Sequence, residues 1–123
     1  MKYLLMIYAN QQTWAGLDPD DWTKAIAEQD AFNAEFFATG ELLGAFGLAD
    51  AARAKVVRMH EGTPAVTDGP YLEAKEYLAS YYLLDVESEE RALEIAARMP
   101  YAAFRGVEVW PVQHEADQPG ADM

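Results

Sequence analysis

The fold is decided first by residues 2–9, which read KYLLMIYA. Apolar side chains occupy both the odd and the even positions, a pattern typical of a strand that is buried on both faces. Residues 77–86 (YLASYYLLDV) repeat the pattern apart from Ser80 and Asp85. Two such strands need cover on both faces of the sheet, and this requirement governs the rest of the architecture.

Caps and periodicity predict the elements around these strands. Asp18 caps a helix over residues 19–39 that Gly40 ends, and a stripe of residues recurs along it at near-helical spacing: Trp22, Ile26, Gln29, Phe32, Phe36 and Phe37. Ser88 caps a second helix, which Pro100 closes. We predict further strands at 41–48, 54–60 and 107–112, a shorter extended piece at 64–67, and an acidic flexible tail over 113–123.

The order β, α, β, β, α, β predicts an α+β, ferredoxin-like sandwich with an antiparallel sheet, formed by a domain over residues 1–112. That plan places both helices on one face and leaves the other face bare. Because a bare apolar face of this size usually marks an interface, we expect a homodimer joined through the open sheet face or by related edge pairing. The sheet would then enclose a cleft.

Composition restricts the class of function. The chain has 123 residues, 51% of them apolar, and a formal net charge of −12, which disfavours direct binding to nucleic acid. It has no cysteine, which fits a reducing compartment. The N-terminal apolar run is short for a signal peptide, and no stretch approaches the roughly 20 residues that span a membrane. We therefore expect a cytoplasmic protein without a membrane partner.

The loop at residues 67–76, TDGPYLEAKE, lies between two strand-like runs and combines a turn signature, an aromatic residue and several ionisable side chains. Asp68 starts a turn signature with Gly69 and Pro70, so one interpretation is that its carboxylate only caps the turn. The alternative is that Asp68 is a general base or orients a substrate at the mouth of the cleft. An aspartate pKa of about 3.9 would have to rise by burial for that role near neutral pH.

Lys75 and Glu76 end the same loop. They are either a solvated pair that protects the edge of the next strand or an anion-binding pair, in which Lys75 binds a carboxylate or phosphate and a glutamate holds it. Their spacing does not separate these alternatives.

The third strand candidate carries His60 and Arg58 on one face, with Val57 and Met59 on the other. This alternation places the two basic side chains on the cleft side, with His60 as a weaker catalytic candidate; the alternative is a histidine that faces solvent.

The phenols of Tyr71 and Tyr82 are candidates to line a pocket, and Trp14 is the loop aromatic expected to cover it. Histidine and acidic residues show no metal-binding spacing, and glycine-rich dinucleotide or phosphate motifs do not occur, so we expect no metal and no cofactor.

The loop TDGPYLEAKE, the opening MKYLLMIY and the closing VEVWP at 107–111 together resemble the YCII-related family, and more narrowly its DGPF (DGPFAETKE) branch. The resemblance covers about residues 1–112 and implies a dimeric α+β barrel of ferredoxin-like units. Asp68 matches the family's aspartate, and Lys75 with Glu76 matches its Lys-Glu pair. The motif's phenylalanine is Tyr71 here, and the family's suspected histidine has no counterpart at the end of the first strand.

We conclude that the sequence favours a small dimeric protein that binds or transforms a small metabolite in a sheet-lined cleft. The resemblance implies isomerase-like, lyase-like or cofactor-free oxygenase-like chemistry. The alternative function is a non-catalytic regulatory module that partners an extracytoplasmic-function sigma factor, since genes of this branch often accompany such factors.

Overall fold

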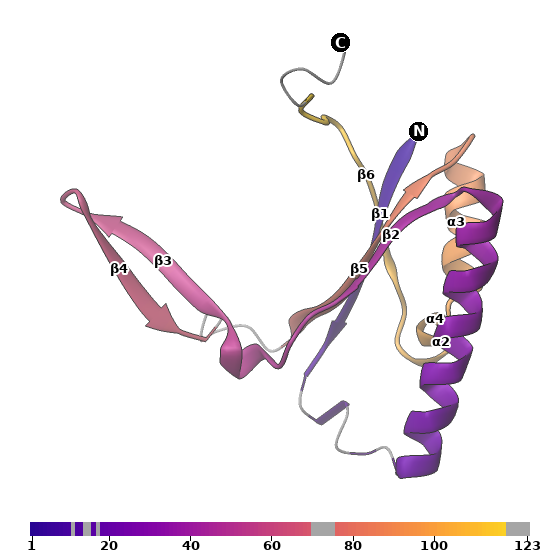
Figure 1. Ribbon diagram of the computed structural model, residues 1–123, viewed down its shortest axis with the longest axis horizontal. Coiled ribbons are helices and arrows are strands. Elements are labelled where there is room, and N and C mark those ends of the chain that lie inside the picture. Colours follow the sequence, from indigo (N-terminus) through magenta and orange to yellow (C-terminus); the bar gives the residue numbers. More distant parts are fainter. Residues whose placement is uncertain (11, 14–15, 17, 70–75, 118–123) are drawn as a thin grey trace.

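The computed structural model describes residues 1–10, 12–13, 16, 18–69 and 76–117, and within them it shows a four-stranded antiparallel sheet, helices on one face, and a separate two-stranded hairpin (Figure 1). The architecture is therefore α+β with antiparallel sheets, as the order of elements predicted.

The main sheet has the strand order β2-β5-β1-β6, and each strand runs antiparallel to its neighbours. This order, with helical connections after the first and third of these strands, is consistent with a ferredoxin-like plan. The longest pairing joins β1 to β5, from Lys2 opposite Asp85 to Ala9 opposite Tyr77. The strands are β1 (Lys2–Ala9), β2 (Leu42–Gly47), β5 (Tyr77–Asp85) and β6 (Glu108–Pro111).

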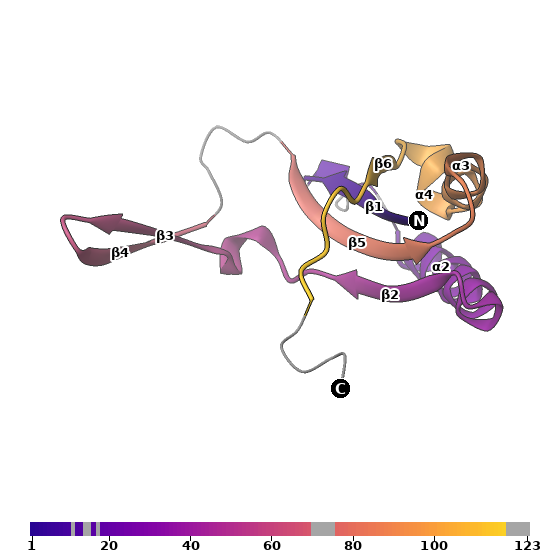
Figure 2. The ribbon, with the colours of Figure 1, turned by 90° about the horizontal axis from the view of Figure 1, so that it is seen from above.

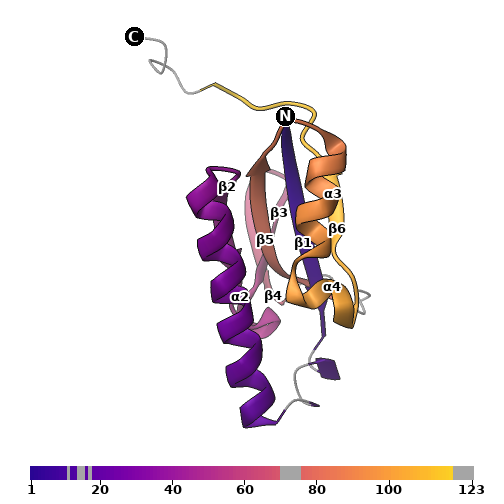
Figure 3. The ribbon, with the colours of Figure 1, turned by 90° about the vertical axis from the view of Figure 1, so that its right-hand side faces the viewer.

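Three helices cover one face of this sheet in the described part of the chain: α2 (Pro19–Thr39), α3 (Glu89–Ala97) and α4 (Pro100–Phe104) (Figure 3). The predicted helix at 19–39 is confirmed: the Asp18 carboxylate accepts from the Asp21 amide at 2.8 Å, and Gly40 ends the helix at φ +83°. Pro100 does more than close the second helix. It begins α4, because its fixed φ suits the first turn of a helix.

The core lies between the sheet and the helices. Along β1, Tyr3, Leu5 and Ile7 are buried toward the helices, whereas the alternate side chains are only half-buried. Within one chain, β1 is thus covered on one face rather than on both. The other buried side chains of this core are Phe32, Phe36, Leu42, Tyr82, Leu84, Val86, Ala92, Ile95, Ala96 and Met99.

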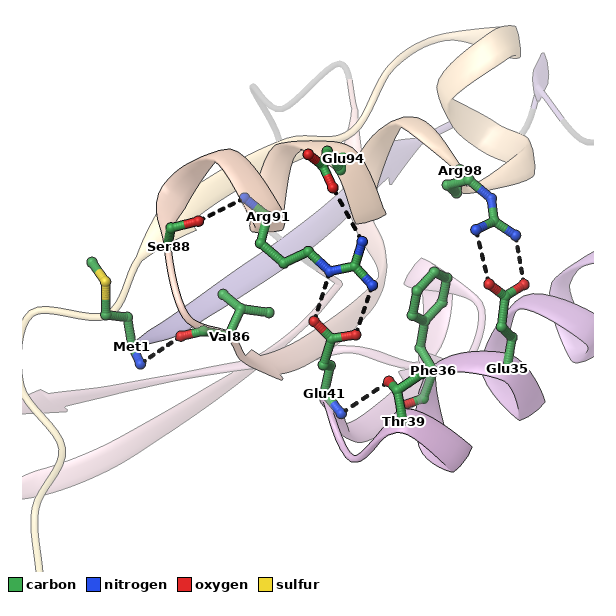
Figure 4. A network of polar contacts seen from close by, with 10 residues as sticks. All are labelled: Met1, Glu35, Phe36, Thr39, Glu41, Val86, Ser88, Arg91, Glu94 and Arg98. Carbon is green, nitrogen blue, oxygen red and sulfur yellow. Dashed lines mark hydrogen bonds and ion pairs between the residues drawn. The ribbon is translucent and has the colours of Figure 1, made fainter.

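Ion pairs join the helices at one end of this core (Figure 4). The Arg91 guanidinium donates Nε to one oxygen of the Glu41 carboxylate at 2.8 Å and Nη2 to the other at 2.9 Å. This hydrogen bonding lowers the pKa of Glu41 below its ordinary value. Arg98 makes a similar two-pronged contact with Glu35 of α2. The pairs fasten α3 to α2 and to the start of β2.

Residues 55–68 form a hairpin apart from the main sheet, made of β3 (Lys55–His60) and β4 (Thr63–Asp68), which within the described residues pair with each other alone. A short 3₁₀ helix, η1 (Ala51–Arg53), leads into it. Figures 1 and 2 show that this hairpin, called the arm below, projects on the side of the sheet opposite to the helices. Among the described residues β3 pairs with β4 and not with the main sheet, so the placement of Arg58 and His60 beside a sheet-lined cleft stays a prediction.

Candidate functional site

A groove of about 330 Å³ lies between α2, α4 and the helix-facing side of the sheet. Below it is called the α2 groove. Its walls are mainly apolar, and its polar lining comes from both the helix and the sheet. Side chains that line it are Ile7, Trp22, Ala25, Ile26, Glu28, Gln29, Ser80, Tyr82, Pro100, Tyr101 and Phe104.

The groove exists because only the C-terminal half of α2 packs closely on the sheet. The buried side chains of this helix are Phe32 and Phe36. In the N-terminal half, Trp22 and Ile26 lie on the same stripe and are 40% and 54% exposed. Phe104 of α4 is 57% exposed at the same groove. Apolar side chains at this spacing are usually core, so their exposure here marks a concave surface that could hold an apolar molecule.

Tyr82 supplies a buried polar group to the groove. Its side chain comes from β5 and is only 6% exposed. Burial raises the pKa of Tyr82 above its ordinary value, and a hydrogen bond to Ser80 partly opposes that shift. The phenol therefore stays protonated at neutral pH and can donate a hydrogen bond to a carbonyl or hydroxyl oxygen.

A second cavity of about 310 Å³ lies where β1 and β2 end and β5 begins. Asn10, Asp50 and Tyr77 are among its lining residues, and Trp22 lines both this cavity and the α2 groove. The two hollows therefore meet at one indole, which could report on binding in either.

Arg105 holds the end of the sheet beside these cavities. Its guanidinium donates to the Thr13 hydroxyl at 2.8 Å and pairs with the Glu76 carboxylate at 2.6 Å. Thr13 is itself only 7% exposed, and its amide and hydroxyl both donate to the Asn10 side-chain oxygen. Nearby, the Tyr101 hydroxyl donates to the Tyr8 carbonyl at 2.8 Å. These contacts connect the end of β1, the start of β5 and the region of α4.

The structure separates the site residues that the sequence suggested. Tyr82 lies in the lining of the α2 groove, and Glu76 forms an ion pair with Arg105. Arg58, His60 and Asp68 all lie on the arm. Trp14, Tyr71 and Lys75 lie outside the residues that the structure describes.

Asp68 and His60 occupy opposite ends of the arm. Asp68 faces Lys55 at the base and forms an ion pair with it, whereas His60 faces Thr63 beside the turn. The Lys55 ammonium lowers the pKa of the Asp68 carboxyl, chiefly through a hydrogen bond. An exposed carboxylate with a lowered pKa is a poor general base near neutral pH. Among the described residues, no three potential metal ligands of the His, Asp, Glu or Cys types come together.

Sequence reasoning missed most of the groove lining, notably Ile26, Ser80 and Phe104 as pocket residues. The stripe Trp22, Ile26 and Gln29 did identify the correct helix face. The pattern could not indicate that the N-terminal half of this face stands away from the sheet, because spacing along a helix does not encode its distance from a neighbouring element.

Comparison with known proteins finds one family domain and one related protein that match most of this chain. The YCII-related domain matches residues 1–114 of this chain. An uncharacterised protein from Rhizobium meliloti is 26% identical over 96 residues, which cover 78% of this chain and 77% of that protein. No helix in the described ranges has the length and apolar character needed to cross a membrane.

Proposed function

The chain belongs to the YCII-related family, and we propose that it acts as a homodimer that binds a small, mainly apolar metabolite in the α2 groove. The observation that carries this proposal is the apolar groove with the buried Tyr82 phenol in its wall. Ligand pockets in proteins commonly combine apolar walls with a few polar groups that fix orientation.

The charge of the site favours a neutral or cationic ligand. Glu28 is the charged side chain in the groove lining, and the whole chain carries a net charge of −12. Lys24 pairs with Glu28 at 3.8 Å, so the net charge of the chain is what would chiefly repel an anionic ligand. An uncharged aromatic compound could stack on the apolar wall and accept a hydrogen bond from Tyr82.

Turnover in this groove would be of a proton-transfer type. A carboxylate and a protonated phenol, Glu28 and Tyr82, line the same hollow. Glu28 is exposed and pairs with Lys24 at 3.8 Å, so the buried phenol of Tyr82 is the group that would act, as the acid. The sequence suggested Asp68 as the proton acceptor. Its ion pair with Lys55 would instead hold together the two strand ends of the arm that lie nearest the body.

We propose that the dimer forms through the face of the main sheet that the helices leave bare. Phe46 and Tyr81 stack on this face with ring centroids 4.9 Å apart. Trp110 of the edge strand β6 lies opposite Leu4 on the same face and is 55% exposed. Gly44 lets the Phe46 ring lie close to the strand, since a Cβ there would come within 2.7 Å of it. We call this set the open face: Leu4, Met6, Phe46, Tyr81, Leu83 and Trp110.

Binding can be tested with two probes that share the naphthalene ring, 2-naphthol and 2-naphthoate, titrated by isothermal calorimetry. We expect 2-naphthol to bind and 2-naphthoate to bind at least 10-fold more weakly, because its carboxylate meets Glu28 and an acidic protein. Replacing Tyr82 by phenylalanine should weaken 2-naphthol binding by roughly 10-fold, the usual cost of one lost hydrogen bond.

The matched control is Tyr81→Phe, which removes the neighbouring hydroxyl on the opposite face of the same strand. It should leave 2-naphthol binding unchanged. If both variants bind 2-naphthol as the parent protein does, the ligand does not use the α2 groove. If neither probe binds, the groove is not a ligand site and the non-catalytic regulatory module becomes the better account.

A further inference from the structure

We infer that the arm, residues 55–68, lies against the body of a second copy of this chain, so that each copy clasps the other. This inference rests on the homodimer proposed above and adds a second contact to it. The body here means the main sheet with α2, α3 and α4.

The arm has one apolar face that nothing in the described chain covers. Val57 lies opposite Val66, and Met59 lies opposite Pro64, so these side chains share a face. Val57, Met59 and Val66 are 62%, 66% and 62% exposed. On the other face Arg58 and His60 lie opposite Ala65 and Thr63. The arm is thus amphipathic in the manner of a strand pair that packs on a surface.

The arm is well formed as a hairpin but has no core of its own. Glu61 and Gly62 at its tip have φ of +50° and +80°, the geometry of a two-residue turn with matching twist. An isolated two-stranded hairpin is only marginally stable in water. Its ordered state therefore calls for another surface, and its exposed apolar face is where that surface would lie.

The position of the arm indicates that this surface belongs to a second copy. Figures 1 and 2 agree that the arm projects on the bare side of the main sheet, away from the helices. A molecule seated on the open face would therefore lie beside the arm. In a two-fold dimer, each copy would occupy this position relative to the other.

The area of the open face supports the same conclusion. From the usual strand spacing and rise, a four-stranded face with strands of this length has a planar footprint of roughly 400 Å². A stable interface needs about 800 Å² on each partner. One face of the arm offers roughly 200 Å², and each copy would both extend its own arm and receive the other. The two arms would thus supply the missing area.

Charge is compatible with this arrangement. The arm carries two basic side chains, Lys55 and Arg58, and two acidic ones, Glu61 and Asp68. Its net charge is zero, so the rest of the chain carries the whole formal charge of −12. A neutral arm can lie on an acidic body without the repulsion that two bodies exert on each other.

The test compares dimer dissociation constants by sedimentation velocity for the full chain and three variants. The arm variant Val57→Thr, Met59→Thr, Val66→Thr keeps strand propensity while making the apolar face polar. Its matched control, Val56→Thr with Ala65→Thr, makes the same kind of change on the opposite face. The third variant, Leu83→Lys, places a charge on the open face.

We expect the arm variant to raise the dissociation constant by roughly 100-fold, because the dimer loses two contacts at once. The control should change it by less than about 3-fold. Leu83→Lys should give a monomer. An arm variant that dimerises as tightly as the control overturns the clasp, and if Leu83→Lys is still monomeric the proposed dimer stands. A Leu83→Lys variant that dimerises normally overturns the dimer itself.

A shortened chain gives a second measurement. The Gly69 amide donates to the Ala54 carbonyl at 2.6 Å, so the base of the arm is already closed by a hydrogen bond. Replacing residues 55–68 with Asn-Gly should leave the body folded and weaken the dimer to the same extent as the arm variant. An unchanged dissociation constant for this shortened chain would also overturn the clasp.

Discussion

The body and the arm are built from similar strands but are stabilised differently. In the body, Leu5 and Leu84 are completely buried between the sheet and the helices. In the arm, Val57 and Val66 face each other across the hairpin and are both 62% exposed. Hydrophobic burial stabilises a strand in proportion to the apolar area removed from water. The body can therefore fold alone, whereas the order of the arm depends on what covers it.

Truncating one apolar side chain in each region should give the largest difference in the free energy of unfolding between the body and the arm. Leu84→Ala removes a fully buried side chain, and we expect it to reduce the free energy of unfolding by about 3 kcal/mol, as in other cores. Val66→Ala in the arm should reduce it by less than about 0.5 kcal/mol in the monomer. Urea unfolding at low protein concentration measures both. Equal losses would show that the arm belongs to the same cooperative unit as the body.

Part of this contrast was visible in the sequence. Asp18 and Gly40 marked the ends of α2 correctly, since caps act locally and depend on residue type. The alternation of apolar and polar residues at 54–60 predicted a strand, and 64–67 predicted an extended piece beside it. Alternation reports that one face is apolar but carries no information about which sheet or which copy covers it. The detachment of the arm could therefore not be predicted from these residues.

The candidate site shows the same limit. Tyr82 was predicted to line a cleft enclosed by the sheet, whereas the structure has it in the lining of the α2 groove on the helix-facing side, so its contact with a ligand stays a prediction. Asp68 was singled out from its turn signature, and that signature did not indicate its partner Lys55, 13 residues earlier along the chain. Pairing across a hairpin is set by register, and register depends on where the turn forms.

Removing one carboxylate charge from an ion pair in each region should change the melting temperature by an intermediate amount. In the body, Glu41→Gln removes the charge of a carboxylate that Arg91 binds with two hydrogen bonds. We expect the melting temperature at pH 7 to fall by roughly 4 °C. In the arm, Asp68→Asn should change it by less than about 1 °C, because exposed pairs contribute little.

The pH dependence provides the control for this pair of variants. Arg91 lowers the pKa of Glu41 below its ordinary value near 4.5, so the stabilisation is fully present above that value. It is lost as the pH falls through the lowered pKa, where the carboxylate becomes protonated in the folded protein too. The difference between the parent protein and Glu41→Gln should therefore shrink below about pH 4. A difference that stays constant down to pH 3 would assign the effect to packing rather than charge.

The smallest expected effect acts on the arm alone. Glu61 adopts φ +50° at the first position of the tip turn, where asparagine is better tolerated than glutamate. Glu61→Asn should stabilise the hairpin by about 0.5 kcal/mol. Counting from a two-residue turn, Arg58 and Ala65 form a hydrogen-bonded pair. Their amides should therefore exchange with solvent roughly 2-fold more slowly in the monomer, while the urea midpoint of the body stays the same.

Because Glu61→Asn leaves the apolar face of the arm intact, it should also tighten a dimer that uses that face. Slower exchange in the monomer without tighter association would mean that ordering the arm and covering it are separate events, and would break the link between the two regions.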